Sequence, residues 1–225
     1  MFSFINEIQA LLITTITINF LFSFYLNKLN NILNFYDYPS NKRKIHKIKI
    51  SLLGGFVFFV NLNIYFVFDF YFFKKFINYS YISLLLSLWV IFIIGIIDDK
   101  KDLKAYLKSV FFIFVILISI LPNENLVIQN LKFSFLENEL KLNTFSYFFT
   151  VICIFLFINA FNMYDGINGQ AGIYIIIFFS YLFSKNIVFE ISSILIICGI
   201  FFIYFNLKNK LFLGDNGSLL ISLLI

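Results

Sequence analysis

Four short polar segments, each containing at least one aspartate, interrupt a chain that is otherwise strongly apolar. They span residues 37–55, 95–108, 159–172 and 212–218. Ionisable groups at the edge of a membrane are costly unless they serve a purpose, so their recurrence suggests a built site. Carboxylates from several loops, combined with basic side chains, suit the binding of a hard cation and of phosphate groups. Phosphoryl transfer is therefore the chemistry that these residue types favour.

The second segment contains two adjacent aspartates, Asp98 and Asp99, directly after an apolar run. Adjacent carboxylates repel each other, so a pair held at a membrane edge usually shares a cation or meets a phosphate–metal complex. The structural alternative is that the pair caps the end of one helix and the start of the next. The sequence of this segment alone does not decide between the two.

The third and fourth segments each place an aspartate among glycines and amides. Asp165 lies in the stretch NAFNMYDGINGQAG, whose backbone N–H groups and following helix could bind an anion. Asp215 lies in GDNGS, at the start of another apolar run, where it could bind a cation or cap a helix. We expect the third segment to be more than a simple turn.

The first segment is basic and carries Arg43, Lys44 and His46 before a pair of glycines. It could be a solvated loop that sets membrane orientation, or these side chains could bind phosphate or pyrophosphate. His46 is the one histidine of the chain, which disfavours a zinc site.

The composition predicts a membrane protein that must position these segments with helices. Of 225 residues, 61% are hydrophobic and 13% are charged, and the mean hydropathy is +0.92. The net charge of +5 arises largely from lysines in short loops, which favours contact with lipid headgroups or phosphate ligands over nucleic acid. Cys153 and Cys198 lie in apolar runs, and we expect buried free thiols.

About seven complete spans and a truncated eighth are predicted, giving an all-α polytopic membrane helix bundle in one domain over residues 1–225. A span needs about 20 apolar residues. Basic residues concentrate in alternate loops, beginning with the first polar segment, which places these loops in the cytoplasm and the N-terminus outside. The candidate spans are 4–26, 52–73, 80–97, 110–121, 145–158, 173–183, 188–205 and a run beginning near 219.

In order along the chain, the four segments resemble the motifs of one enzyme family. The patterns are Asp-x-Pro followed by Arg-Lys-x-His and Gly-Gly, Gly-x-x-Asp-Asp, Asn-x-x-Asn-x-x-Asp-Gly-x-(Asp/Asn)-Gly and Gly-Asp-x-Gly-Ser. The chain is similar to the polyprenyl-phosphate N-acetylhexosamine-1-phosphate transferases. That family includes the undecaprenyl-phosphate GlcNAc-1-phosphate transferases and the phospho-MurNAc-pentapeptide translocases. The sequence Asn-Ala-Phe-Asn-Met at residues 159–163 favours the GlcNAc branch.

The resemblance implies a Mg²⁺-dependent transferase, with Mn²⁺ as the alternative cation. It would move a sugar-1-phosphate from a UDP-sugar to undecaprenyl phosphate and release UMP, at the cytoplasmic face of the bacterial inner membrane. The expected partners are these two substrates and the lipid bilayer, with monomer and homodimer both left open. The implied catalytic residues are Asp98, Asp99 and Asp165; the implied metal ligands are Asp215, Asp98 and Asp99; and the implied substrate-binding residues are Arg43, Lys44, His46, Lys108, Asn162 and Asn168.

The chain departs from the family pattern in several respects, among them Lys49 and Ser51, which stand where prolines are common. Asn168 stands where an acid is frequent, and the sequence ends soon after the Gly-Asp-x-Gly-Ser motif, before the His- and Arg-rich loop of the family. The expectation is therefore a domain incomplete at its C-terminus. A non-catalytic truncated remnant and a multi-span transporter are the alternatives, the latter requiring polar relays inside the spans, where Asn61, Asn63 and Asp69 are the main polar residues.

Overall fold

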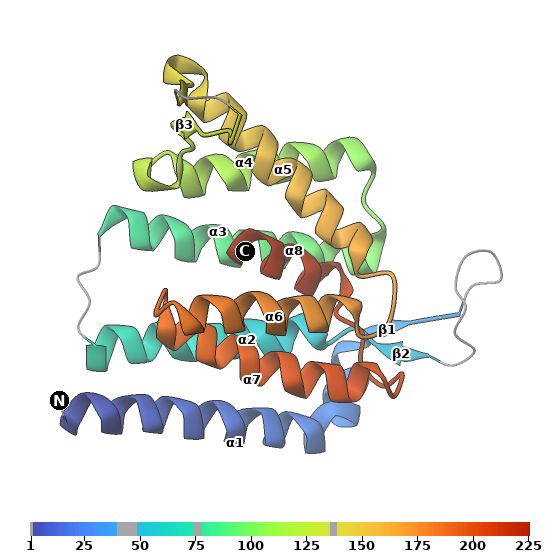
Figure 1. The fold of residues 1–225 in the computed structure, drawn as a ribbon. Coiled ribbons are helices and arrows are strands. Elements are labelled where there is room, and N and C mark those ends of the chain that lie inside the picture. Colours follow the sequence, from blue (N-terminus) through green and yellow to red (C-terminus); the bar gives the residue numbers. More distant parts are fainter. Residues whose placement is uncertain (1, 40–48, 74–77, 136–138) are drawn as a thin grey trace.

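Apolar runs along the chain form α-helices wherever the sequence predicts spans (Figure 1). The computed structural model describes residues 2–39, 49–73, 78–135 and 139–225. The α-helices in these ranges are α1 Phe2–Leu33, α2 Gly54–Phe68, α3 Tyr79–Lys101, α4 Ala105–Ile120, α5 Ser146–Tyr164, α6 Gln170–Ser184, α7 Phe189–Asn206 and α8 Gly214–Leu224. A π-helix, η1 Asp69–Phe73, continues α2, and two 3₁₀ turns are η2 Glu124–Leu126 and η3 Asn143–Phe145.

Two short antiparallel strand pairs complete the described secondary structure. They are β1 Tyr36–Asp37 with β2 Ile50–Ser51, and β3 Asn130–Leu131 with β4 Leu140–Lys141. The predicted all-α membrane bundle is confirmed, and each predicted span overlaps a helix, although α4 and α6 are shorter than a complete span. Five helical stretches in the described residues are long and apolar enough to cross a bilayer: Glu7–Leu33, Gly54–Tyr71, Tyr79–Lys101, Asn143–Tyr164 and Phe189–Asn206. The protein is therefore a multi-pass membrane protein.

Several helices extend further into the polar segments than the predicted span limits, most clearly α3 and α5. The predicted third span ends at 97, whereas α3 continues to Lys101 and includes both adjacent aspartates in its last turns. The helix stops at Asp102, which adopts a left-handed conformation and donates its backbone N–H to the Asp98 carbonyl. Likewise, α5 runs to Tyr164, so Asn162 lies on a helix. Polar residues at these helix ends lower the hydropathy but do not break the helical backbone.

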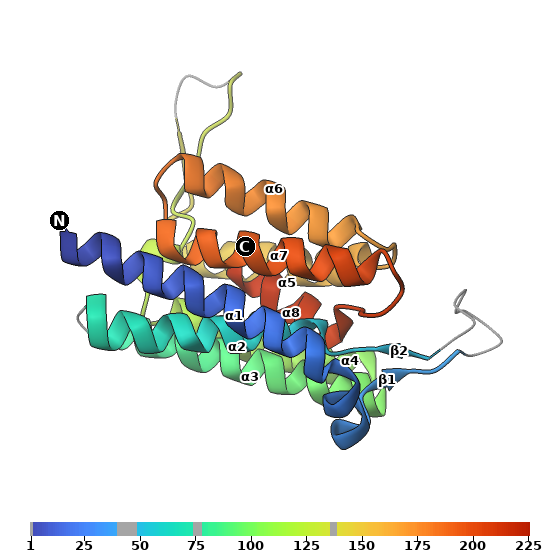
Figure 2. The same ribbon diagram turned by 90° about the horizontal axis from the view of Figure 1, so that it is seen from below.

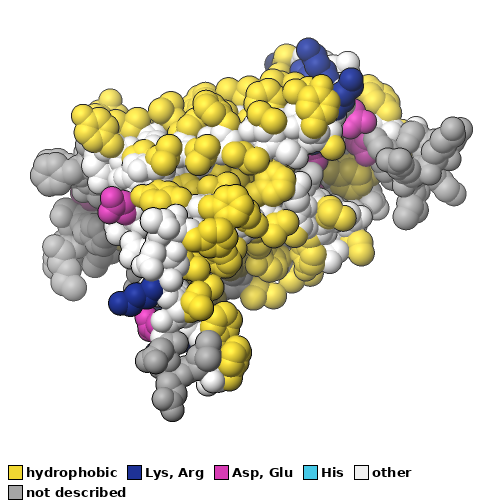
Figure 3. All heavy atoms as spheres, turned by 90° about the horizontal axis from the view of Figure 1, so that it is seen from above, with side chains coloured by type: hydrophobic (Ala, Val, Ile, Leu, Met, Phe, Trp, Pro, Cys, Tyr) yellow, Lys and Arg dark blue, Asp and Glu magenta, His cyan; other side chains and the backbone are white. Residues whose placement is uncertain are grey.

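Most helices lie side by side along one direction, with α5 inclined to the others and β1 and β2 at one end (Figures 1 and 2). Short α8 is central, because it packs against α2, α3 and α5 and its residues from Asn216 to Ser222 are all buried. On the face shown in Figure 3, hydrophobic side chains cover the middle and charged side chains gather toward the two ends. This distribution matches a bundle embedded in lipid.

Two glycines allow α8 to lie directly against its neighbours. A Cβ added to Gly55 in α2 would collide with the backbone of Gly217, and one added to Gly95 in α3 would collide with the backbone of Asn216. The start of α8 is therefore wedged between α2 and α3 at backbone contact distance. The glycines of the first and second motifs thus have a packing role.

Amides inside the spans hold helices together. Asn61 Nδ2 donates to Asn19 Oδ1 at 2.8 Å, which joins α2 to α1, and also to the Val57 carbonyl at 2.7 Å. Asn63 Nδ2 donates to the Phe59 carbonyl of its own helix at 2.8 Å. Interhelical hydrogen bonds of this kind stabilise membrane bundles. The two amides therefore make local and helix–helix contacts, which gives no support to the transporter alternative.

Candidate active site

The start of α8 meets the other three polar segments, at the end of the bundle where β1 and β2 lie (Figure 1). The residues just before α8 are hydrogen bonded to the first polar segment: the N–H of Phe212 donates to the Ser51 carbonyl at 2.7 Å. In return, the N–H groups of Gly54 and Gly55 donate to the carbonyls of Phe212 and Leu213, each at 3.0 Å. Gly-Gly of the first motif thus fixes the fourth motif by backbone hydrogen bonds.

Asp99 caps α8 from α3. One carboxylate oxygen, Oδ1, accepts from the N–H of Asp215 at 2.9 Å. The other, Oδ2, accepts from the N–H of Asn216 at 3.0 Å and from its side-chain Nδ2 at 2.5 Å. A carboxylate stabilises a helix N-terminus because it satisfies free N–H groups and complements the helix dipole. Asp99 therefore caps a helix, but not the next helix along the chain as the alternative from the sequence supposed: it caps α8, which is distant in the chain.

Asp98 is oriented differently and pairs with Lys108. Its Oδ1 accepts from the N–H of Leu103 at 2.8 Å, and its Oδ2 lies 2.5 Å from Lys108 Nζ. The same ammonium is 3.8 Å from Asp215 Oδ2. Asp98 is 3% exposed, whereas the side chains of Lys108 and Asp215 are 23% and 30% exposed. The three side chains form one charged cluster from the ends of α3, α4 and α8.

Asp165 joins this cluster electrostatically from the C-terminus of α5. Burial, followed by the charges of Asp215 and Asp99, raises the pKa of the Asp165 carboxyl to about 8. Burial, followed by the nearby Asp98 carboxyl and the charge of Asp99, raises the pKa of Asp215 to about 7. Burial and neighbouring carboxylates therefore both disfavour the ionised forms of Asp165 and Asp215, and a nearby positive charge would offset this effect.

Amides position the third segment against the fourth. Asn162 Oδ1 accepts from the Ser218 hydroxyl at 2.6 Å, which joins α5 to α8. Asn168 Nδ2 donates to Asn209 Oδ1 at 2.6 Å, so the asparagine that replaces a frequent family acid ties the turn before α6 to the turn after α7. These contacts orient the backbone around Asp165.

Asn206, at the end of α7, was not predicted from the sequence. Its Oδ1 accepts from the N–H of Gly169 at 2.5 Å and its Nδ2 donates to the Leu211 carbonyl at 2.9 Å. The residue is 4% exposed, so a single buried amide clamps the loops that lead to Asp165 and Asp215. Its sequence signal was weak: one amide directly after a predicted span.

The chemistry of the donor set fits a divalent cation. Asp98 and Asp215 offer hard carboxylate oxygens, and Asp215 is accessible from solvent. Among the described residues, no group of three or more His, Cys, Asp and Glu side chains is arranged as a complete metal site. Mg²⁺ is commonly held by one or two carboxylates together with substrate phosphates, so two carboxylates meet that requirement. Both carboxylate oxygens of Asp99 already accept hydrogen bonds from α8. A role of Asp99 as a metal ligand or catalytic residue therefore stays a prediction.

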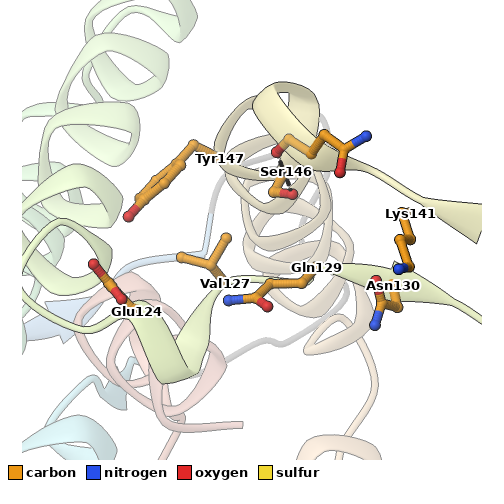
Figure 4. A pocket seen from close by; sticks show the side chains of 8 residues that line it. Glu124, Val127, Gln129, Asn130, Lys141, Ser146 and Tyr147 are labelled. Carbon is orange, nitrogen blue, oxygen red and sulfur yellow. Dashed lines mark hydrogen bonds between the residues drawn. The ribbon is translucent and has the colours of Figure 1, made fainter.

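Three predicted substrate-binding residues, Arg43, Lys44 and His46, lie outside the described residues. Most of the predicted site residues that the structure describes lie around the start of α8, whereas Asn168 contacts the turn after α7. A separate cavity of about 480 Å³ lies at the other end of the bundle, between the loop after α4 and the start of α5 (Figure 4). It is lined by polar residues including Glu124 and Lys141 and contains none of the predicted site residues.

The sequence was compared with known protein families and characterised proteins. Residues 81–225, from α3 through α8, match glycosyl transferase family 4. The chain belongs to this family. The match includes the second, third and fourth polar segments, which meet at the start of α8.

Characterised relatives extend the family 4 similarity over more of the chain. The undecaprenyl-phosphate alpha-N-acetylglucosaminyl 1-phosphate transferase of Escherichia coli O157:H7 is 30% identical over 214 residues, covering 89% of this chain and 56% of the relative. A probable undecaprenyl-phosphate N-acetylglucosaminyl 1-phosphate transferase of Bacillus subtilis (strain 168) is 27% identical over 190 residues, covering 81% and 51%. The phospho-N-acetylmuramoyl-pentapeptide-transferase of Thermotoga maritima is 31% identical over 151 residues, covering 60% and 48%. This chain therefore spans about half the length of the relatives that it matches.

Proposed function

We propose that this family 4 protein takes part in transferring GlcNAc-1-phosphate from UDP-GlcNAc to undecaprenyl phosphate, with release of UMP. The observation that carries the proposal is the convergence of Asp98, Lys108, Asp165 and Asp215 at one end of the bundle. The names of the Escherichia coli and Bacillus subtilis relatives support undecaprenyl phosphate as acceptor and GlcNAc-1-phosphate as the group transferred.

In this reaction an oxygen of undecaprenyl phosphate attacks the sugar-linked phosphorus of the UDP-sugar. The bond from that phosphorus to the bridging oxygen breaks, and UMP leaves with the bond's electron pair. A phosphate monoester is already largely ionised at neutral pH, because its second pKa is about 6. Removal of a proton by Asp98 or Asp99 is therefore of less value than positioning and charge neutralisation.

The residues of the chain supply that positioning. Asp99 fixes the start of α8 and so the location of Asp215, and Asn162 and Asn206 fix the segment that carries Asp165. Lys108 supplies positive charge beside the carboxylates. Asp98 and Asp215 would hold Mg²⁺, with Mn²⁺ as a substitute, and a bound cation would neutralise charge developing on the departing phosphate.

The site belongs at the cytoplasmic face of the bacterial inner membrane. The distribution of lysine and arginine supports this orientation, because the loops at the α8 end carry more basic residues than those at the other end. A cytoplasmic site would meet a water-soluble UDP-sugar from solution and the lipid phosphate from the headgroup region.

A radiolabel transfer assay tests the proposal. Membranes containing the protein would be incubated with undecaprenyl phosphate, Mg²⁺ and UDP-GlcNAc labelled in the sugar. The Asp215→Asn variant would be assayed in parallel, together with Glu124→Gln as a control at the opposite end of the bundle. We expect lipid-soluble label with the wild type and the control, and a loss of more than about 100-fold with Asp215→Asn. Label from UDP-MurNAc-pentapeptide in place of UDP-GlcNAc would assign the other sugar branch. Absence of transfer from both nucleotides would refute the proposal.

A further inference from the structure

Lys108 lies where a cation shared by Asp98 and Asp215 would be expected. Its ammonium is 2.5 Å from Asp98 Oδ2 and 3.8 Å from Asp215 Oδ2. The lysine comes from the first turns of α4, while the two carboxylates come from the last turns of α3 and the first turn of α8. One positive side chain therefore joins three helices at the acidic cluster.

The charge at this cluster makes a cation necessary. Asp98 is 3% exposed, and its Oδ2 is fully buried. A buried carboxylate is costly unless a positive group lies beside it. Lys108 supplies the positive charge that the Asp98–Asp215 pair needs.

We propose that Lys108 is the internal counter-ion of the metal-free protein and leaves the Asp98–Asp215 pair when a divalent cation binds there. The inference rests on the metal site of the proposed function, and it adds that Lys108 limits metal affinity by competition. The ammonium contacts oxygens that the metal also needs, so both cations cannot hold them at full strength. The Lys108 side chain has a flexible four-carbon stem and is 23% exposed, so its ammonium can move away from the two carboxylates toward solvent.

The competing interpretation is that the ion pair between Lys108 and Asp98 is a permanent structural contact between α4 and α3. A permanent contact would hold Asp98 in place for the metal, so removal of the Lys108 ammonium would weaken metal binding. A competing counter-ion predicts the opposite, because its removal frees the carboxylate oxygens. The sign of the change in metal affinity therefore separates the two roles.

Binding of Mn²⁺ to the purified protein, followed by electron paramagnetic resonance at pH 8, provides the test. We expect Lys108→Met to bind Mn²⁺ about tenfold more tightly than the wild type, which corresponds to about 1.4 kcal/mol. Lys108→Arg keeps the charge and should remain within about twofold of the wild type. Lys104→Met removes an exposed lysine one turn earlier and controls for the overall field. We expect this control to change the affinity by less than about twofold.

Equal or weaker Mn²⁺ binding by Lys108→Met would overturn the proposal, as would a wild type that binds no Mn²⁺ at millimolar concentration. A second readout follows the lysine itself: acetylation of Lys108 relative to Lys104, measured by mass spectrometry, should rise when Mn²⁺ is added. An unchanged or lower ratio would also overturn it. Neither measurement contains a sugar nucleotide or a lipid substrate, so a failed transfer assay and a failed exchange experiment are distinguishable.

Discussion

The carboxylate of Asp99 is hydrogen bonded to both the backbone N–H and the side-chain amide of Asn216, which lies 117 residues later in the chain. The contact fixes the first turn of α8 against the end of α3. Its neighbour Asp98 turns instead toward Lys108. Two adjacent and chemically identical side chains therefore have different surroundings, because successive residues on a helix point about 100° apart.

Removing one acceptor oxygen of Asp99 should loosen the start of α8. In Asp99→Asn, the side-chain NH₂ replaces an oxygen that now accepts, so at least one buried N–H of α8 loses its partner. We expect a loss of about 1–3 kcal/mol, seen as a lower melting temperature of the detergent-purified protein. Asp102→Asn is the matched control, since Asp102 is exposed and asparagine tolerates its left-handed backbone. Equal melting temperatures for the two variants would contradict a capping role.

A methyl group at Gly95 should force α8 away from α3. The Cβ of alanine there would overlap the backbone of Asn216, which cannot rotate aside as a flexible side chain could. We expect Gly95→Ala to destabilise the protein by about 1–3 kcal/mol or more and to lower its yield in membranes. The measurement is the melting temperature together with the fraction of monodisperse protein after extraction.

Gly166→Ala is the control for this change. A Cβ at Gly166 would meet the Met163 carbonyl at 3.4 Å, which is ordinary contact. We expect its stability to stay within about 0.5 kcal/mol of the wild type. If Gly95→Ala behaved like Gly166→Ala, the close packing of α3 and α8 would be wrong.

Hydropathy was sufficient to predict the spans because membrane insertion depends on the summed apolarity of about 20 residues. It was insufficient at helix ends, where Asp98, Asp99 and Asn162 lie on α3 and α5 although they lower the local hydropathy. Backbone hydrogen bonding continues through polar residues, and a helix stops only where a residue such as Asp102 changes conformation. The extent of α3 and α5 therefore could not be predicted from apolarity.

The motif order predicted which residues gather, and the structure brings Asp98, Asp99, Lys108 and Asn162 to α8. The sequence could not assign partners, because the direction of a side chain depends on helix rotation and on packing between distant segments. Asn206 shows this limit: its importance comes from the two loops that its amide reaches, and those contacts span 37 and 5 residues. One asparagine after an apolar run carries no such information.

Loss of the Asn206 amide should release the loop around Asp165. Asn206→Ala removes the acceptor for the Gly169 N–H and the donor to the Leu211 carbonyl. We expect faster hydrogen–deuterium exchange in peptides covering residues 165–172, because opening this loop requires less free energy. Asn63→Ala is the matched control, since its amide bonds within one helix. Similar exchange of this loop in both variants would show that Asn206 does not hold it.

The raised pKa of Asp165 predicts a pH dependence of stability in the metal-free protein. The folded carboxyl has a pKa of about 8 against an ordinary value of 3.8, so the folded state retains a proton that the unfolded state has released. Its contribution is fully present below pH 4 and is lost as pH rises through about 8, because stability falls wherever the folded state binds more protons. In EDTA, we therefore expect the wild-type melting temperature to fall between pH 7 and pH 9.

Asp165→Asn isolates this contribution, because an amide does not titrate. The decline between pH 7 and pH 9 should become shallower in Asp165→Asn and should persist in Asp102→Asn, whose carboxylate lies at an exposed helix end. Asp215 has a pKa of about 7 and adds most of its effect below this window. If Asp165→Asn and the wild type lost stability equally from pH 7 to pH 9, Asp165 would not be held in a half-buried, negatively charged environment.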